Sequence, residues 1–315
     1  MRLKGRKVLV TGGFGFLGAN LCLKLLAEGA GVRVIDLFPC PSDNLLAPYT
    51  KIIESKQCNM VNENEVGAAL ENIDTVVHLA FPMALRGNVP ERDTILENLA
   101  GLLNLTKAAQ ERDALFVYVS SIAVYGQEQY RPVDENHPLE PVMMYGGIKL
   151  ASENICRTMA RSNKLRLIIL RAADIYGPAN ARLSVPVRFL LQAISGQPIT
   201  VYGDGSDSRT YTFVEDFSEA VVLALINPAA VGEVFNVGGD KCVSMHELAL
   251  AAKKVTGSQS PVAYLDAPTS GRRLAIDNSK IKKTLGYKPA YSIEQGLILT
   301  AEWLTNNRHK FQLTD

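Results

Sequence analysis

The chain has 315 residues, 47% of them hydrophobic, and a formal net charge of +1 at pH 7. This composition predicts a soluble globular protein of one or two domains, and excludes a general affinity for nucleic acid or an anionic membrane surface. Apolar runs stay below the roughly 18 residues that span a membrane, and no signal peptide is predicted. Five scattered cysteines and four scattered histidines lack disulfide or metal-ligand spacing, so we expect reduced thiols, a cytoplasmic location and no metal.

A glycine-rich turn follows the first apolar strand, near residues 8–11. Gly12, Gly15 and Gly18 recur every third residue, and a helix is expected over Ala19–Glu28. In a strand–turn–helix unit, Gly12 permits the tight turn, Gly15 the approach of backbone to a pyrophosphate, and Gly18 close helix–strand packing. The positive end of the helix dipole then faces an anion. Because glycines also mark ordinary turns, this pattern needs support from its surroundings.

The next strand-like run supplies that support. Residues 31–35 end in Asp36, 18 residues beyond Gly18. A carboxylate at this spacing accepts hydrogen bonds from an adenosine ribose and repels a 2′-phosphate. The sequence therefore predicts a dinucleotide site that favours NAD over NADP.

Strands and helices alternate as far as about residue 177. Further strands are predicted near 51–55, 74–80, 115–119 and 165–170, and further helices ending near Leu70 and covering 94–110 and 145–162. This alternation predicts an α/β fold, a Rossmann-type doubly wound parallel sheet with helices on both faces. Ligands of such sheets lie beyond the carboxyl ends of the strands.

After residue 177 the segments become shorter and the alternation lapses. We therefore expect an NAD-binding domain over 1–177 and a smaller, mixed substrate-binding lobe over 178–315. A helical run at 213–226 and a strand-like run at 233–238 indicate that 212–240 returns to the first domain, so the single boundary is an approximation.

Tyr145 and Lys149 are four residues apart on a predicted helix and so share one face. A phenol acts as a base only if its pKa is lowered from about 10, and a nearby ammonium group favours the phenolate. The pair is common by chance, but this one begins 24 residues after Ser121, which ends a predicted strand. Ser121 can hold the same substrate oxygen by a hydrogen bond.

These motifs together resemble the extended short-chain dehydrogenase/reductase family, in its nucleotide-sugar epimerase/dehydratase branch. The resemblance runs from Lys7 to about Leu299. Beyond the features above it rests on the segments His78-Leu79-Ala80, Ser121-Ile122-Ala123-Val124-Tyr125-Gly126, Asp174-Ile175-Tyr176-Gly177-Pro178, Gly203-Asp204-Gly205 with Arg209, and Phe235-Asn236-Val237-Gly238.

The resemblance implies a set of site residues. Tyr145 would be the base, Lys149 would hold the ribose and tune Tyr145, and Ser121 would orient the sugar hydroxyl. The cofactor site would comprise Gly12, Gly15, Phe16, Leu17, Gly18, Asp36, Asn59, Met60, Leu79, Ala80, Phe81, Asn98, Ser120, Tyr145, Lys149 and Ala172. The substrate, which the resemblance implies is linked to UDP, would contact Met83, Ser121, Tyr145, Asp174, Tyr202, Arg209 and Arg272. Arginines such as Arg209 and Arg272 are also common as solvated surface residues.

The resemblance implies a reaction class as well. Dehydratases and decarboxylases of the branch carry an acid shortly after the catalytic hydroxyl, where this chain has Ile122 and Ala123. We therefore predict NAD-dependent 4-epimerisation of a nucleotide sugar of the UDP-glucose/UDP-galactose type, through a 4-keto intermediate. The alternatives are an NAD(P)-dependent ketoreductase or dehydrogenase acting on another sugar or alcohol, and a non-catalytic cofactor-binding protein. Asp174 stands where the branch usually has Asn, and Phe81 where a small residue is usual.

The helices predicted at 94–110 and 145–162 carry apolar stripes. These contain Leu99, Leu102, Leu103 and Leu105, and Ile148, Leu150, Ile155 and Met159. The equivalent helices form a dimer interface in the family, so a homodimer is expected. The alternative is that the stripes pack only on the sheet.

Overall fold

A computed structural model describes residues 1–81, 91–266 and 273–311. The described chain forms two compact units. Unit 1 comprises Met1–Gly126, Leu139–Arg171 and Ser218–Phe235, and unit 2 comprises Gln127–Pro138, Ala172–Phe217 and Asn236–Asp315. The change from one unit to the other thus falls at Arg171, six residues before the boundary expected at 177, and residues 127–138 group with unit 2.

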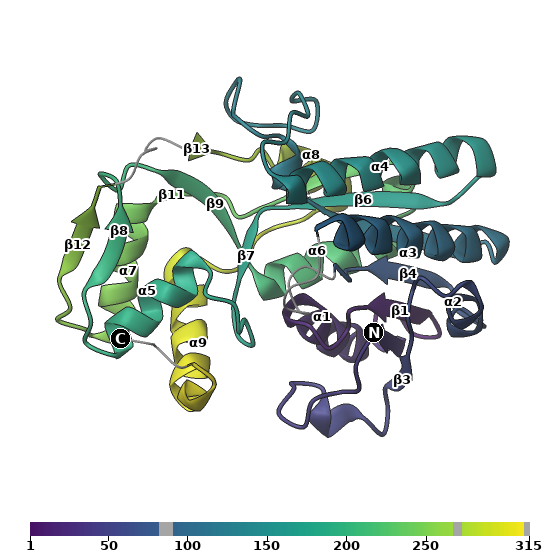
Figure 1. The fold of residues 1–315 in the computed structure, drawn as a ribbon, viewed down its shortest axis with the longest axis horizontal. Coiled ribbons are helices and arrows are strands. Elements are labelled where there is room, and N and C mark those ends of the chain that lie inside the picture. Colours follow the sequence, from purple (N-terminus) through teal and green to yellow (C-terminus); the bar gives the residue numbers. More distant parts are fainter. Residues whose placement is uncertain (82–90, 267–272, 312–315) are drawn as a thin grey trace. The chain divides into compact units, whose positions relative to one another are not determined.

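The first part of the chain alternates strands and helices (Figure 1). Its elements are β1 (Lys7–Thr11), α1 (Phe16–Ala27), β2 (Gly31–Asp36), η1 (Ala47–Tyr49), β3 (Glu54–Gln57), α2 (Glu63–Ala69), β4 (Thr75–His78), α3 (Glu91–Glu111), β5 (Leu115–Ser121), η2 (Ile122–Val124), α4 (Met144–Asn163) and β6 (Leu167–Ala172). Later in the chain, α6 (Val214–Ile226), η3 (Pro228–Ala230) and β10 (Val234–Val237) follow.

The central sheet has seven strands in the order β10-β6-β5-β4-β1-β2-β3. The pairs β2–β3, β1–β2, β1–β4 and β4–β5 are parallel. This confirms the predicted Rossmann-type α/β fold. The order turns back between β1 and β4, and ligands of doubly wound sheets bind at the carboxyl ends of the strands beside such a reversal.

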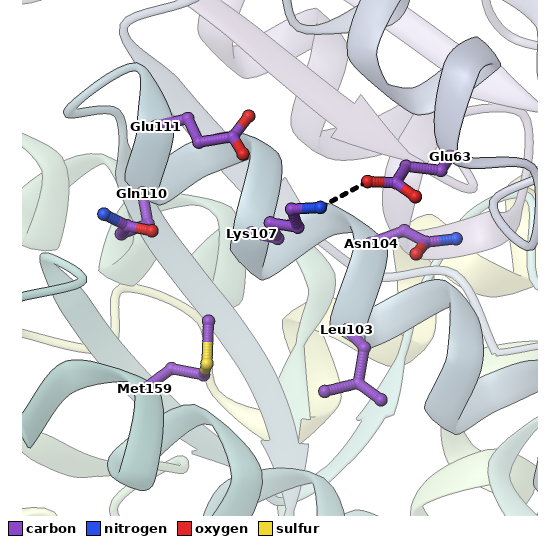
Figure 2. Close-up of a pocket in the computed structure, with 7 residues that line it drawn as sticks. All are labelled: Glu63, Leu103, Asn104, Lys107, Gln110, Glu111 and Met159. Atoms are coloured by element: carbon purple, nitrogen blue, oxygen red, sulfur yellow. Dashed lines mark hydrogen bonds and ion pairs between the residues drawn. The ribbon is translucent and has the colours of Figure 1, made fainter. Parts of the chain in front are cut away.

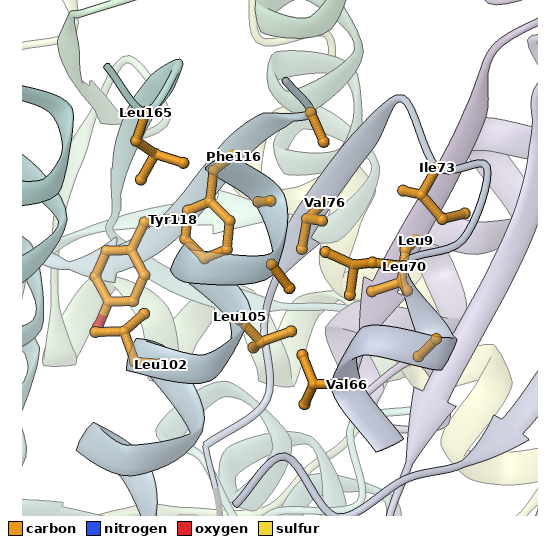
Figure 3. Packing of buried hydrophobic residues seen from close by; sticks show 14 of the residues in the cluster. Leu9, Val66, Leu70, Ile73, Val76, Leu102, Leu105, Phe116, Tyr118 and Leu165 are labelled. Carbon is orange, nitrogen blue, oxygen red and sulfur yellow. The ribbon is translucent and has the colours of Figure 1, made fainter. Parts of the chain in front are cut away.

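Apolar residues of the central strands and of α2, α3 and α4 form one buried cluster. Figure 3 shows ten residues of this cluster, namely Leu9, Val66, Leu70, Ile73, Val76, Leu102, Leu105, Phe116, Tyr118 and Leu165. Since Leu102 and Leu105 are core residues, part of the α3 stripe packs on the sheet. Leu96 and Leu103 of the same helix are exposed.

Several predicted elements begin elsewhere: α3 starts three residues earlier than expected and β6 two residues later, and the first helix and the third strand also differ. The first helix begins at Phe16 instead of Ala19, because Gly15 is its extended N-cap residue and the helix starts directly after it. The third strand begins at Glu54, three residues later than expected. Residues before it close a turn in which the Ile53 N–H donates to the Tyr49 carbonyl, and pairing with β2 starts only at Glu54.

Unit 2 has small sheets and its own core. Its further elements are β7 (Asp174–Tyr176), α5 (Val185–Ile194), β8 (Ile199–Tyr202), β9 (Ser208–Phe213), β11 (Cys242–Ser244), α7 (Met245–Thr256), β12 (Val262–Leu265), β13 (Arg273–Leu274), α8 (Ser279–Leu285), α9 (Ile293–Asn306) and η4 (Arg308–Lys310). β9 lies between β11 and β13 and also pairs with β7, while β12 pairs with β8. In the described part of the chain, no helix is both long and apolar enough to cross a membrane.

Candidate active site

The glycine turn between β1 and α1 is built by close backbone contacts. Gly12 has φ +65°, a conformation that favours glycine. A Cβ on Gly18 would lie 2.3 Å from the Gly12 carbonyl oxygen, so only glycine lets the helix approach the turn this closely. Gly13, which the spacing argument passed over, is equally constrained, because its Cβ would lie 2.6 Å from the Val34 side chain. The first turn of α1, with Phe16 and Leu17, therefore presents its amides at a helix N-terminus, which suits a pyrophosphate.

Asp36 ends β2 beside this turn. Its Oδ2 accepts a hydrogen bond from the Phe14 N–H at 3.3 Å and its Oδ1 one from the Leu37 N–H at 2.8 Å. Burial raises the pKa of Asp36, while these backbone donors oppose the shift. Each carboxylate oxygen has a second lone pair with which to accept a ribose hydroxyl. The glycine turn and Asp36 thus fit an adenosine dinucleotide without a 2′-phosphate.

Thr11 and His78 hold the loop after β4 next to the turn. The Thr11 hydroxyl accepts hydrogen bonds from the Leu79 and Ala80 N–H groups at 3.1 and 3.0 Å. It therefore donates its own proton to His78 Nδ1, 2.8 Å away. Burial lowers the pKa of His78 to about 3, which keeps the ring neutral and able to accept. Sequence reasoning missed this pair, although Thr11 and His78 end adjacent strands.

The remaining predicted cofactor residues lie on elements of the same sheet. Asn59 and Met60 follow β3, and the Asn104 side chain donates to the Met60 carbonyl at 3.0 Å. Asn98 is a buried residue of α3 whose side chain donates to the Thr94 carbonyl at 2.7 Å. Ala172 ends β6. The cofactor roles of Asn59, Met60, Asn98 and Ala172 therefore stay predictions.

Ser120 and Ser121 end β5. Ser121 Oγ accepts a hydrogen bond from the Ala123 N–H at 3.2 Å, and its own hydroxyl proton can be donated to a ligand. A Cβ on Gly146 would lie 2.4 Å from the Ala123 carbonyl oxygen. Glycine at 146 therefore lets the start of α4, and Tyr145 with it, pack against the turn that Ser121 begins.

Tyr145 and Lys149 occupy the first turns of α4, as expected from their spacing. Lys149 is buried, and its Nζ donates to the Val119 carbonyl at 2.9 Å. The rings of Phe81, Tyr118 and Tyr145 have centroids 4.9, 5.0 and 5.9 Å from this nitrogen. Burial lowers the pKa of Lys149 to about 8, with Glu153 opposing the shift.

A buried ion pair anchors α4 to β6. Arg171 Nη2 lies 2.8 Å from Glu153 Oε2, and Arg171 Nε donates to Glu153 Oε1 at 3.0 Å. Arg171 also donates to the Tyr125 hydroxyl at 3.0 Å. Since Glu153 lies one turn after Lys149, this pair fixes the helix that carries the predicted catalytic residues. The sequence analysis did not single out either residue.

Three predicted substrate residues lie in unit 2. Asp174 begins β7, and its Oδ2 forms an ion pair with Nη1 of Arg209 in β9 at 3.3 Å. Tyr202 ends β8 as an exposed residue, with the Arg188 guanidinium 5.3 Å from its ring centroid. Met83 and Arg272 fall outside the described residues.

A hollow of about 400 Å³ lies on unit 1. It is lined by Glu63, Leu103, Asn104, Lys107, Gln110, Glu111 and Met159, from α2, α3 and α4 (Figure 2). An ion pair of 2.5 Å joins Lys107 to Glu63 beside it. The hollow includes no residue predicted to bind cofactor or substrate.

Comparison with known proteins tests the predicted family. A model of the NAD dependent epimerase/dehydratase family matches residues 8–238. The chain belongs to the NAD-dependent epimerase/dehydratase family. This confirms both the predicted family and NAD as the cofactor, and it makes the chain an enzyme of a family that acts on nucleotide sugars.

Relatives within the family are named for different reactions. An uncharacterised UDP-glucose epimerase of Bacillus subtilis is 30% identical over 95% of this chain and 98% of its own length. A dTDP-glucose 4,6-dehydratase of Xanthomonas campestris is 29% identical, over 95% of this chain and 93% of the relative. The crystal structure of a Thermotoga maritima UDP-glucose 4-epimerase with UDP-glucose matches with a TM-score of 0.86 and 27% identity, over 96% and 99% of the two chains.

Proposed function

We propose that this enzyme epimerises a nucleotide sugar at C4, with a UDP-linked hexose as substrate. The observation that carries the proposal is the arrangement at the start of α4. Gly146 packs that helix against the turn of Ser121, Ile122 and Ala123, and Tyr145 and Lys149 lie on its first turns. The turn contains a hydroxyl but no carboxylate, so an acid for elimination or decarboxylation is missing from it. Similarity to UDP-glucose epimerases supports the same reaction.

In the proposed mechanism Tyr145 removes the proton of the C4 hydroxyl, which Ser121 holds by a hydrogen bond. Bound NAD, which the glycine turn and Asp36 would hold, would supply a reversible hydride acceptor for C4, so that hydride could return to the opposite face of the 4-keto sugar. Tyr145 then gives the proton back, so the chain itself is unchanged after each turnover. The Lys149 ammonium favours the phenolate of Tyr145 and supplies donors for a ribose hydroxyl. The glycine turn, Asp36 and the Leu79–Phe81 backbone are proposed to bind the rest of the cofactor.

In unit 2 we propose that Arg209 and Tyr202 bind the nucleotide part of the substrate, which makes this unit the substrate-binding lobe. The Asp174 carboxylate balances the charge of Arg209 at 3.3 Å. That contact favours the second candidate, a ketoreductase or dehydrogenase that acts on an alcohol without a diphosphate. A non-catalytic role would leave the combination of Ser121, Tyr145 and Lys149 without a purpose.

The two reactions differ in their cofactor balance. The protein is purified without added cofactor, its bound small molecules are identified by mass, and it is incubated with UDP-glucose or UDP-galactose. An epimerase interconverts the two sugars with no net change in NADH, whereas a dehydrogenase consumes free cofactor. Tyr145→Phe is expected to lower turnover by ~10²-fold or more. Tyr130→Phe, which removes a hydroxyl bonded to Asp134, is the matched control. Full turnover in Tyr145→Phe contradicts the assignment.

We also propose a cytoplasmic homodimer formed through α3 and α4. Leu96 and Leu103 are exposed on α3, and Leu103 borders the hollow of Figure 2. A second copy would cover this apolar surface. Sedimentation at micromolar concentration is expected to give a dimer, and a monomer contradicts this assembly.

A further inference from the structure

Lys149 lies in an unusual place for a buried cation. Its recorded hydrogen-bond acceptor is a neutral carbonyl, that of Val119, at 2.9 Å. The Phe81 and Tyr118 ring centroids are 4.9 and 5.0 Å from Nζ. Aromatic rings at these distances attract a cation and exclude water from it. The ammonium is therefore held largely by π faces.

Phe81 also touches the predicted base. Its ring makes an edge contact with Tyr145, with centroids 5.1 Å apart and planes at 81°. This geometry is one that aromatic pairs prefer. A single side chain thus contacts both members of the predicted catalytic pair.

The backbone next to Phe81 is well anchored. The N–H groups of Leu79 and Ala80 donate to Thr11 Oγ1, and Thr11 itself contacts His78. Phe81 is partly buried. The Phe81 side chain is therefore attached next to a backbone segment held by hydrogen bonds, and its ring can hold another side chain in place.

We propose that Phe81 is a positioning residue: its ring covers the Lys149 ammonium, fixes the Tyr145 ring and keeps water from both. This rests on the proposed function, in which Tyr145 is the base and Lys149 its partner. Removing the ring lets Tyr145 sample other rotamers and admits water to Lys149. The chemical step should suffer more than substrate binding, because the phenol must be aligned when the proton moves.

The pKa of Lys149 gives a test of the proposal that does not depend on turnover, because it can be followed through the pH dependence of stability. The charged neighbour of Lys149 on the packed elements is Glu153, one turn along α4. The titratable groups that are neutral near pH 7 and also face it are His78 at the end of β4, the thiol of Cys156 and the phenols of Tyr118 and Tyr145. Because burial is the main cause of the lowered pKa of Lys149, water admitted by a smaller side chain should raise that pKa toward 10.5.

The experiment compares Phe81→Ala, Phe81→Leu and Phe81→Tyr in the full chain with bound NAD. For UDP-glucose turnover we expect Phe81→Ala to lower kcat about tenfold and to change KM less than about threefold. Phe81→Tyr, which keeps the ring, should recover kcat to within about threefold of the parent, and Phe81→Leu should recover less. Phe38→Ala, at an exposed phenylalanine, is the control for loss of a ring.

The second measurement is the free energy of unfolding of the same variants in urea, between pH 7 and 10.5. In the parent, stability should rise with pH above about 8 as buried Lys149 loses its proton, and this rise should be smaller in Phe81→Ala. An unchanged kcat in Phe81→Ala, a rise in KM alone, full recovery by Phe81→Leu, or an unchanged pH slope each overturns the proposal. If Tyr145→Phe is inactive while Phe81→Ala is normal, only this inference fails. If Tyr145→Phe stays active, the proposed function fails, and the pH slope still decides whether Phe81 shields Lys149.

Discussion

Two arginine–carboxylate pairs differ sharply in burial, although one member of each, Arg171 and Asp174, lies within three residues of the other. The side chains of Arg171 and Glu153 are 1% and 0% exposed and meet through two hydrogen bonds, at 2.8 and 3.0 Å. Those of Arg209 and Asp174 are 33% and 42% exposed and meet through one contact of 3.3 Å. Water can replace either partner of the second pair but not of the first. The buried pair is therefore part of the framework, while the exposed pair is the one proposed to open for a ligand.

The buried pair gives the largest expected effect. Burial opposes ionisation of Glu153, yet the Arg171 guanidinium lowers its pKa overall, so both groups are charged. Arg171→Met leaves the carboxylate with Arg157, 2.8 Å away and partly exposed, and is expected to cost about 3–5 kcal/mol of unfolding free energy. Urea denaturation measures this. The double variant Arg171→Met/Glu153→Leu should recover most of the loss, and a single-variant loss below about 1 kcal/mol would contradict the framework role.

Lys149 differs from both arginines, because it is a buried cation held by a carbonyl and aromatic rings instead of a carboxylate. Its pKa falls from 10.5 unfolded to about 8 folded, so the folded state binds fewer protons between these values. Stability therefore rises with pH across this window, and below pH 8 the buried charge costs about 3 kcal/mol. Lys149→Met should abolish turnover yet increase stability at pH 7 by up to that amount.

The control for Lys149→Met is the same measurement at high pH. The gain in stability over the parent should shrink as the pH approaches 10.5, where the lysine is neutral in both states. Unfolding in urea at pH 7 and at pH 10 gives the two values. A variant that is less stable than the parent at pH 7 would mean that the rings stabilise the ammonium more than burial penalises it.

The exposed pair gives the smallest effect on stability. Asp174→Asn should change the unfolding free energy by less than about 1 kcal/mol, because exposed ion pairs contribute little. It also removes the negative charge beside Arg209, so affinity for UDP should rise about fivefold at low salt and less at high salt. Calorimetric titration with UDP, with Arg209→Gln as the background control, measures this. Weaker binding by Asp174→Asn would mean that Asp174 contacts the ligand directly.

Much of the site could be predicted because its signals are local. The spacing of Gly12, Gly15 and Gly18 identifies the turn, and the four-residue spacing of Tyr145 and Lys149 puts both on one helical face. The starts of the first helix and the third strand differ from those expected because a cap and a turn, whose geometry the pattern does not encode, set them. Gly13 and Gly146 were missed because their importance comes from Val34 and Ala123, which lie elsewhere in the chain.

The sequence by itself determined the family, the fold class, the cofactor and the predicted catalytic residues, because periodicity and short motifs reflect backbone geometry within a few residues. Tertiary structure decided which side chains meet. The ring of Phe81 over Lys149, the buried pairing of Arg171 with Glu153, and the contact of Asp174 with Arg209 join residues from separate elements. The strength of each charge contact depends on how much water surrounds it, and burial is a property of the packed chain.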